Sequence, residues 1–158
     1  MRLNPMAHIF VSYQEMLFLG CFHHLEGLLG TRMRVAEGRS DGPLSFSRAV
    51  SHGPPDSRMG TVMMTRVEMD DGVFVHASDI QLLDHAAVDR VIDWGPDLVL
   101  AAGPPLYLDW LDGSGRERAW RNGERLARGV GAVVLDQPGQ RLDFMDDRDR
   151  IEYVRGPA

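Results

Sequence analysis

The residues of this chain that could do chemistry follow the ends of its expected strands. His52 follows one such strand, Asp79 follows a second and Asp136 ends a third. In α/β folds, binding and catalytic side chains gather in the loops just past the carboxyl ends of strands. An imidazole and carboxylates brought together there could hold a metal ion. Each residue also has an ordinary explanation, because loop histidines are common on surfaces and aspartates form turns and cap helices.

Length, charge and cysteine content narrow the class of protein. A chain of 158 residues favours one domain and is long enough to bury a core. Its net charge of −6 argues against a partner held through nucleic-acid phosphates. The single cysteine, Cys21, excludes an internal disulfide framework and a zinc site built from cysteines. The apolar stretch 16–22 is too short to span a bilayer, so we expect a cytoplasmic chain with no membrane partner.

Strand and helix signals alternate along the middle of the chain. The turn Asp70-Asp71-Gly72 is typical of a hairpin, and Asp84 can cap the helix that follows it. Two apolar runs resemble strands that are covered on both faces of a sheet. The expected strands are 44–50, 61–69, 73–77, 97–101 and 131–135, and the expected helices are 84–94 and 116–128. This order predicts an α/β fold with a mixed sheet and covering helices.

The first 40 residues differ in character from the rest. Apolar side chains recur there at three-residue spacing, which favours one amphipathic helix: Met16, Leu19, Phe22 and Leu25. Gly27 and Gly30 would end that helix. We therefore expect a divergent, helical segment over residues 1–40 and a separate unit over residues 41–158.

Four stretches of the second unit form an ordered series. They are SHGPPDSRMG at 51–60, FVHASDIQ at 74–81, PDLVL at 96–100 and GPPLYL at 103–108. In order, spacing and uncommon strings such as HASD, the series resembles the carboxy-terminal half of an uncharacterised, archaeal-type branch of the metallo-β-lactamase superfamily. The resemblance covers about residues 45–140 and does not extend to residues 1–40.

This resemblance implies both a fold and a metal site. The family folds as an αββα sandwich and holds a dinuclear metal site, usually zinc, whose bridging hydroxide attacks a carbonyl or phosphoryl centre. His52 matches a metal-binding histidine of the family, and Asp79 matches the catalytic carboxylate that bridges the two metals. His76 would point to the opposite face of the strand from Asp79. We interpret His76 as a packing or supporting residue rather than a ligand.

The chain also departs from the family pattern. The HxHxDH motif, which supplies most of the family's ligands, is absent from the sequence. Its nearest substitute is the pair His23 and Glu26, which would share a helix face as two weak ligands, or simply belong to an ordinary exposed face. Gln137 stands where the family has its last histidine ligand. Since a catalytic zinc normally has about three protein ligands, His52 and Asp79 alone predict a zinc site that is incomplete or lost.

Three functions remain open. The first is a truncated, degenerate metallo-β-lactamase-like half-domain that lacks the amino-terminal half of the sandwich and does not hydrolyse substrates on its own. The second is one subunit of a split metal-dependent hydrolase acting on an ester, lactone or phosphodiester. The third is a small anion-binding or interaction module. A half-sandwich would expose an apolar sheet face, so we expect self-association or a protein partner that covers it.

Overall fold

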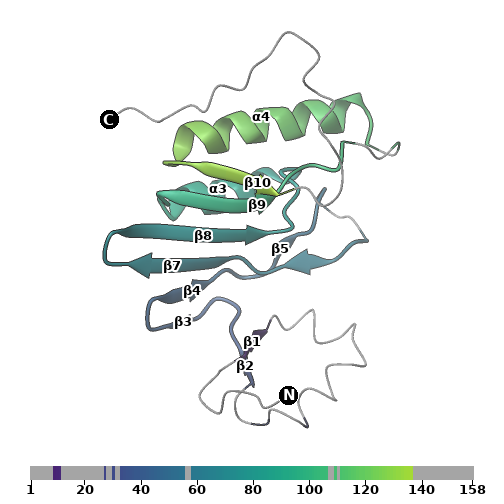
Figure 1. The fold of residues 1–158 in the computed structure, drawn as a ribbon. Helices are drawn as coiled ribbons and strands as arrows, with labels where there is room; N and C mark the ends of the chain where they lie inside the picture. The colour runs from purple at the N-terminus through teal and green to yellow at the C-terminus, as the bar shows by residue number, and fades with distance from the viewer. Residues whose placement is uncertain are drawn as a thin grey trace.

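A computed structural model describes residues 9–11, 27, 30, 33–55, 58–106, 109 and 111–136. Its strands are β1 (Ile9–Val11), β2 (Met33–Val35), β3 (Ser40–Asp41), β4 (Leu44–Phe46), β5 (Val50–Ser51), β6 (Thr61–Val62), β7 (Thr65–Met69), β8 (Gly72–Ser78), β9 (Leu98–Ala102) and β10 (Val133–Asp136). Its helices are α3 (His85–Asp93) and α4 (Gly113–Gly129). The protein is a mixed α/β fold, as the sequence predicted (Figure 1).

Six strands form one sheet in the order β10-β9-β8-β7-β4-β3. Strands β8, β9 and β10 run parallel to one another, whereas β7, β4 and β3 complete the sheet by antiparallel pairing. The pairs β1–β2 and β5–β6 form two smaller sheets. The three parallel strands therefore end at one edge, which we call the carboxyl edge, and the loops after them meet there.

Both helices pack on the same face of the sheet. Alternate residues of β8 and β9, such as Val75 and Val99, are fully buried against side chains of α3 and α4, such as Val88 and Leu126. Asp84 caps α3, because its carboxylate accepts a hydrogen bond from the amide of Ala86 at 3.0 Å. The hydrophobic core therefore lies between this face of the sheet and the two helices.

The other face of the sheet, here called the open face, carries an apolar row that neither helix covers. The register aligns Val67, Phe74 and Leu98 across three neighbouring strands. Leu98 is 40% exposed and Val134, one strand further, is 49% exposed. The prediction that 97–101 and 131–135 are covered on both faces is therefore wrong. An apolar run cannot by itself reveal whether one or both faces of a strand are covered.

The hairpin and the helix after it lie where the sequence predicted, but two expected strands are each broken in two. Residues 44–50 divide into β4 and β5, and residues 61–69 divide into β6 and β7. Ser47 lies at the break between β4 and β5, and the fully buried Met64 lies at the break between β6 and β7. The two breaks are hydrogen-bonded to each other, since the Met64 amide donates to the Ser47 hydroxyl at 2.9 Å. The chain steps there from the main sheet into the β5–β6 pair, which positions the loop that carries His52.

Of the first 40 residues, which were predicted to be helical, the structure describes only a few before residue 33, and Gly27 is one that lies in a helix. Residues 9–11 and 33–35 are strands that pair in parallel. The expected helix around residues 16–25 lies outside the described residues. Among the described helices, none is long and apolar enough to cross a membrane.

Candidate functional site

The loop that follows β8 has an unusual backbone. Ser78, Gln81 and Leu82 all have positive φ angles, of 56°, 54° and 55°. Non-glycine residues avoid this region, and each costs on the order of 1 kcal/mol or more unless its surroundings hold it. Here Ile80 and Leu83 are 0% and 1% exposed, so buried apolar side chains anchor the loop. The loop therefore holds Asp79 and Gln81 in fixed positions at the carboxyl edge.

The second loop of the site follows β5 and approaches the first closely. It carries His52 at its start, and the His52 amide donates to the carbonyl of Gly60 at 3.1 Å. Gly53 has a φ of +83°, and a Cβ there would lie 2.7 Å from Oε1 of Gln81. Glycine is favoured at this position, because side chains rarely adopt a φ of +83° and a Cβ would also displace the amide end of Gln81.

Together the two loops bring His52 and Asp79 into contact, as their positions after two strands predicted. Nε2 of His52 lies 2.7 Å from Oδ2 of Asp79, with the two side chains 22% and 48% exposed. Nδ1 of His52 lies 3.3 Å from the carbonyl oxygen of Met59. A carbonyl only accepts, so a hydrogen bond to Met59 requires the proton on Nδ1, and Nε2 then presents a lone pair. With the proton on Nε2 instead, His52 donates to the carboxylate of Asp79.

Gln81 is a third member of this cluster, and sequence reasoning missed it. Its amide Nε2 lies 3.3 Å from Nε2 of His52, and the residue is only 7% exposed. Its Oε1 is buried and has no hydrogen-bond partner among the described residues. A glutamine between Ile80 and Leu82 in a loop after a strand was the available signal, because a polar side chain among buried apolar ones needs a partner.

The structure does not bring the other candidate residues into this cluster. His76 lies on the open face, aligned with Leu100, and it is exposed, so the packing role expected for it is wrong. Asp136 is exposed at the end of β10, and its carbonyl accepts from the amide of Gly103 at 3.2 Å. Gln137, His23 and Glu26 lie outside the described residues.

The fit of these residues to zinc is partial. Imidazole nitrogen and carboxylate oxygen are ordinary zinc ligands, and His52 makes the bond from its other ring nitrogen to a backbone carbonyl that metal-binding histidines commonly make. Two ligands of one tetrahedral zinc lie about 3.3 Å apart, so the half-exposed Asp79 would have to move slightly. Within the described residues, no group of three or more His, Cys, Asp or Glu could hold a metal ion.

The molecule is thus a mixed α/β protein with a histidine–aspartate pair at the carboxyl edge of its sheet. Its sequence is similar to those of several archaeal proteins. It is 47% identical to a UPF0282 protein of Methanosarcina mazei over 108 residues, which are 68% of this chain and 36% of that protein. It is 35% identical to a UPF0282 protein of Methanopyrus kandleri over 139 residues, which are 82% of this chain and 47% of that protein. It is 39% identical to a UPF0282 protein of Thermococcus gammatolerans over 99 residues, which are 60% of this chain and 32% of that protein.

The chain therefore spans between about a third and a half of the length of these relatives. No protein-family model matches it. No solved structure matches it either.

Proposed function

We propose that this chain is half of a metallo-β-lactamase-like sandwich, which keeps part of a metal site and does not hydrolyse substrates on its own. The contact between His52 and Asp79 carries the proposal, since Nε2 and Oδ2 lie 2.7 Å apart at the carboxyl edge. Sequence resemblance assigns these two residues to the metal site of that superfamily. The UPF0282 proteins supply only a name that states no activity.

The open face supports the half-sandwich reading. In an αββα sandwich each sheet is covered by helices on one face and by the second sheet on the other. Within the described part of the chain, both helices cover one face of the main sheet, and Leu98 and Val134 are 40% and 49% exposed on the other. A second apolar layer would remove these side chains from water.

The number of ligands argues against hydrolysis by the chain alone. A catalytic zinc takes about three protein ligands and a dinuclear pair takes more. His52 and Asp79 are two, and the HxHxDH motif is absent from the sequence. We therefore expect weak binding of a single divalent cation and no turnover of ester or phosphodiester substrates.

Metal analysis combined with an activity assay tests this function. The purified chain is dialysed against ZnCl₂, then assayed for bound zinc and for hydrolysis of p-nitrophenyl acetate and bis-p-nitrophenyl phosphate. We expect at most one ion per chain, lost in His52→Ala, and no hydrolysis. His76→Ala is the matched control, because His76 is exposed on the open face and should leave the zinc content unchanged. Two tightly bound ions with measurable hydrolysis would contradict the proposal.

A second candidate is that this half works as one subunit of a split hydrolase, whose other subunit supplies the missing ligands. The relatives are two to three times longer than the part that this chain matches. The test is co-expression with the remaining part of the Methanosarcina mazei protein. Co-purification of the two chains with new phosphodiesterase or esterase activity supports this candidate, and two chains that elute separately count against it.

A pocket on the helix-covered side favours a third candidate, an anion-binding module. The pocket has a volume of about 270 Å³, and its lining includes Arg48, Arg90 and the hydroxyl residues Ser51 and Thr61. Asp84 also lines it, so its charge is only weakly positive. Titration with inorganic phosphate tests this candidate: saturable binding that is lost in Arg90→Ala supports it, and no binding at millimolar phosphate counts against it.

The apolar row of the open face predicts self-association of the isolated chain. Exposed leucine and valine side chains on one face of a sheet favour association with a second copy. Light scattering should report a dimer or larger species, and Leu98→Asp should shift it toward the monomer. A monodisperse monomer of the unaltered chain would contradict this expectation.

A further inference from the structure

The open face of the main sheet carries one histidine among apolar side chains. We infer that this face binds the open face of a second copy of the chain, and that His76 makes the binding depend on pH. The inference rests on the self-association proposed above and adds the residue that controls it. Strand β8, which carries His76, lies inside the sheet, with β9 and β10 on one side and β7, β4 and β3 on the other (Figure 1).

The strand register shows which side chains surround His76 on this face. Its direct partners across the sheet are Thr65 of β7 and Leu100 of β9. Beyond Leu100, the partner on β10 is Val134. The next row of the face is apolar and contains Val67, Phe74 and Leu98. Since His76 is exposed, its ring meets water in the middle of an apolar surface.

No charged side chain of β7, β8 or β9 shares the open face with His76. Neighbouring residues of a strand point to opposite faces, so Arg66 and Glu68 of β7 belong to the helix-covered face, where they form an ion pair at 2.7 Å. The charged groups of the open face lie on its two outer strands, Asp136 of β10 and Asp41 of β3. Among the described residues, His76 is therefore the ionisable side chain in the interior of this face.

This distribution of charge suits a second copy of the same chain. The chain has a net charge of −6, so two copies repel each other overall. Two open faces can meet without bringing acidic groups together at their centre, because the acidic side chains of the face lie on the outer strands. The contact then removes from water the apolar area of Leu98 and Val134, which are 40% and 49% exposed.

Protonation of His76 opposes this contact. A second apolar face would take the ring out of water, which disfavours its charged form. In a symmetric pair, residues in the middle of the face lie near the two-fold axis, so two charged rings would also approach each other. The contact therefore forms between neutral His76 side chains and weakens as the pH falls through the range in which histidine gains its charge, about pH 8 to pH 5.

Analytical ultracentrifugation of the full chain at about pH 8 and about pH 6 tests the inference. Histidine is mostly neutral at the higher pH and mostly charged at the lower, and each dimer contains two copies of His76. We therefore expect the Kd of the dimer to rise about tenfold at the lower pH. His76→Phe keeps a ring and cannot take up a proton, so its Kd should not rise. His85→Gln is the matched control, because His85 is exposed on α3, and it should leave the pH response unchanged.

The change in net charge works against the expected result. Lowering the pH makes the chain less acidic, which by itself favours association, so weaker association at the lower pH cannot result from net charge. A second variant, His76→Arg, carries a permanent charge and should keep the chain monomeric at both pH values. Thermal melting at both pH values reports whether each variant folds.

The outcomes separate this inference from the self-association on which it rests. If the unaltered chain is a monomer at both pH values, self-association itself fails. If the Kd of the dimer does not change with pH, or if His76→Phe responds to pH as the unaltered chain does, the role of His76 is overturned and self-association stands. If His76→Phe fails to fold, a folded His76→Arg that dimerises as tightly as the unaltered chain overturns that role.

Two further outcomes test the choice of surface and occupant. If Leu98→Asp dimerises as tightly as the unaltered chain, the interface lies outside the open face and the inference is overturned. If the remaining part of the Methanosarcina mazei protein displaces the second copy, that part is the occupant of the open face and the second copy is overturned as its partner.

Discussion

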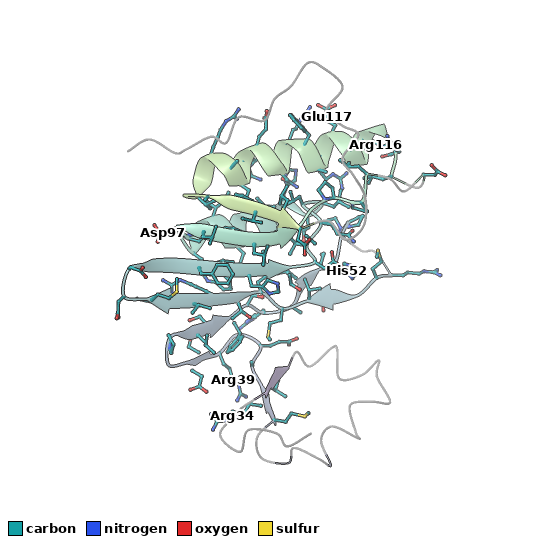
Figure 2. All side chains as sticks on the ribbon, viewed as in Figure 1. Arg34, Arg39, His52, Asp97, Arg116 and Glu117 are labelled. Carbon is teal, nitrogen blue, oxygen red and sulfur yellow. The ribbon has the colours of Figure 1, made fainter. Side chains whose placement is uncertain are left out.

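Two aspartates at opposite ends of the main sheet show the difference between a structural carboxylate and a candidate ligand. Figure 2 places Asp97 at the end of the sheet where β9 begins and His52, the partner of Asp79, at the carboxyl edge. Oδ2 of Asp97 accepts from the amide of Val73 at 2.8 Å, and the Asp97 amide donates to the Val73 carbonyl at 2.9 Å. Asp97 thus links the start of β9 to β8 and satisfies the backbone amide and carbonyl of Val73.

The carboxyl edge lacks this completeness. Asp79 contacts a side chain rather than a backbone amide, Gln81 has an unsatisfied buried oxygen, and three non-glycine residues have positive φ. Unsatisfied polar atoms and backbone strain persist in native proteins where surrounding structure holds them, and they concentrate at functional sites. The comparison shows that hydrogen bonds to the backbone complete the Asp97 end, whereas the carboxyl edge keeps an unsatisfied buried oxygen and a strained backbone, as the proposed binding site would.

The largest expected loss of stability comes from a substitution at the Asp97 end of the sheet. A Cβ at Gly131 would lie 2.5 Å from the backbone carbonyl oxygen of Asp97, and no side-chain movement can relieve that contact. We expect Gly131→Ala to lower the free energy of unfolding by about 2–3 kcal/mol in urea denaturation. Gly113→Ala is the control, because a Cβ there meets nothing within 4 Å. Equal stability of the two variants would show that the Asp97 end is not tightly packed.

The next effect concerns the support of the carboxyl edge. Asn122 of α4 is 0% exposed, and its side-chain amide donates to the Leu82 carbonyl at 2.8 Å, next to Gln81. We expect Asn122→Ala to cost about 2 kcal/mol of stability, from the lost bond and the cavity. Cation affinity should fall too, because the loop loses its anchor. Asn122→Leu fills the site with a slightly larger apolar side chain and removes the bond, so a variant as stable as the unaltered chain would contradict the importance of the bond.

The two aspartates themselves provide the sharpest paired test. Asp97→Ala removes the acceptor of the Val73 amide and should cost about 1 kcal/mol, with no change in cation affinity. Asp79→Ala should leave stability within about 0.5 kcal/mol, since its side chain is half exposed, and should abolish cation binding. Urea denaturation and titration calorimetry on both variants measure the two quantities. The same outcome for both residues would erase the distinction between the two ends.

Much of the fold could be predicted because its signals are local. The turn residues Asp70 and Asp71 predicted the β7–β8 hairpin, and the cap Asp84 predicted the start of α3. The exposure of β10 could not be predicted, because Val134 and Leu135 have the composition of buried residues. Which face of a strand is covered depends on helices far away in the sequence.

The candidate site divides in the same way. The positions of His52 and Asp79 after two expected strands predicted that they would meet, and they do. Gln81 depends on positive φ angles and on the approach of Gly53 from another loop, at a distance that no local pattern encodes. The helix α4 begins at Gly113, where Asp112 caps it, rather than at residue 116 as predicted. The prediction missed this start because the glycines that follow Asp112 have a low helix propensity.

The smallest expected effect concerns Asp112, which follows β9 and is a structural carboxylate near the same edge as the candidate site. Its Oδ1 accepts from the amide of Gly115 at 2.7 Å and from the hydroxyl of Ser114 at 2.8 Å. The Gly115 bond first, and the Ser114 bond second, lower the pKa of Asp112 below its usual value of 3.8. The ionised carboxylate therefore contributes stability above about pH 4, and this contribution is lost as the pH falls through the lowered pKa.

Asp112→Asn tests this role, because asparagine caps a helix without titrating. The stability of the two chains, measured by urea denaturation from about pH 6 down to about pH 2.5, should converge as the carboxylate of the unaltered chain takes up its proton. Cation affinity at neutral pH should be the same in both. If the free energies of unfolding of the two chains differ by the same amount across the acid range, the ionised carboxylate of Asp112 does not contribute to stability. A loss of cation binding would instead extend the candidate site to the start of α4.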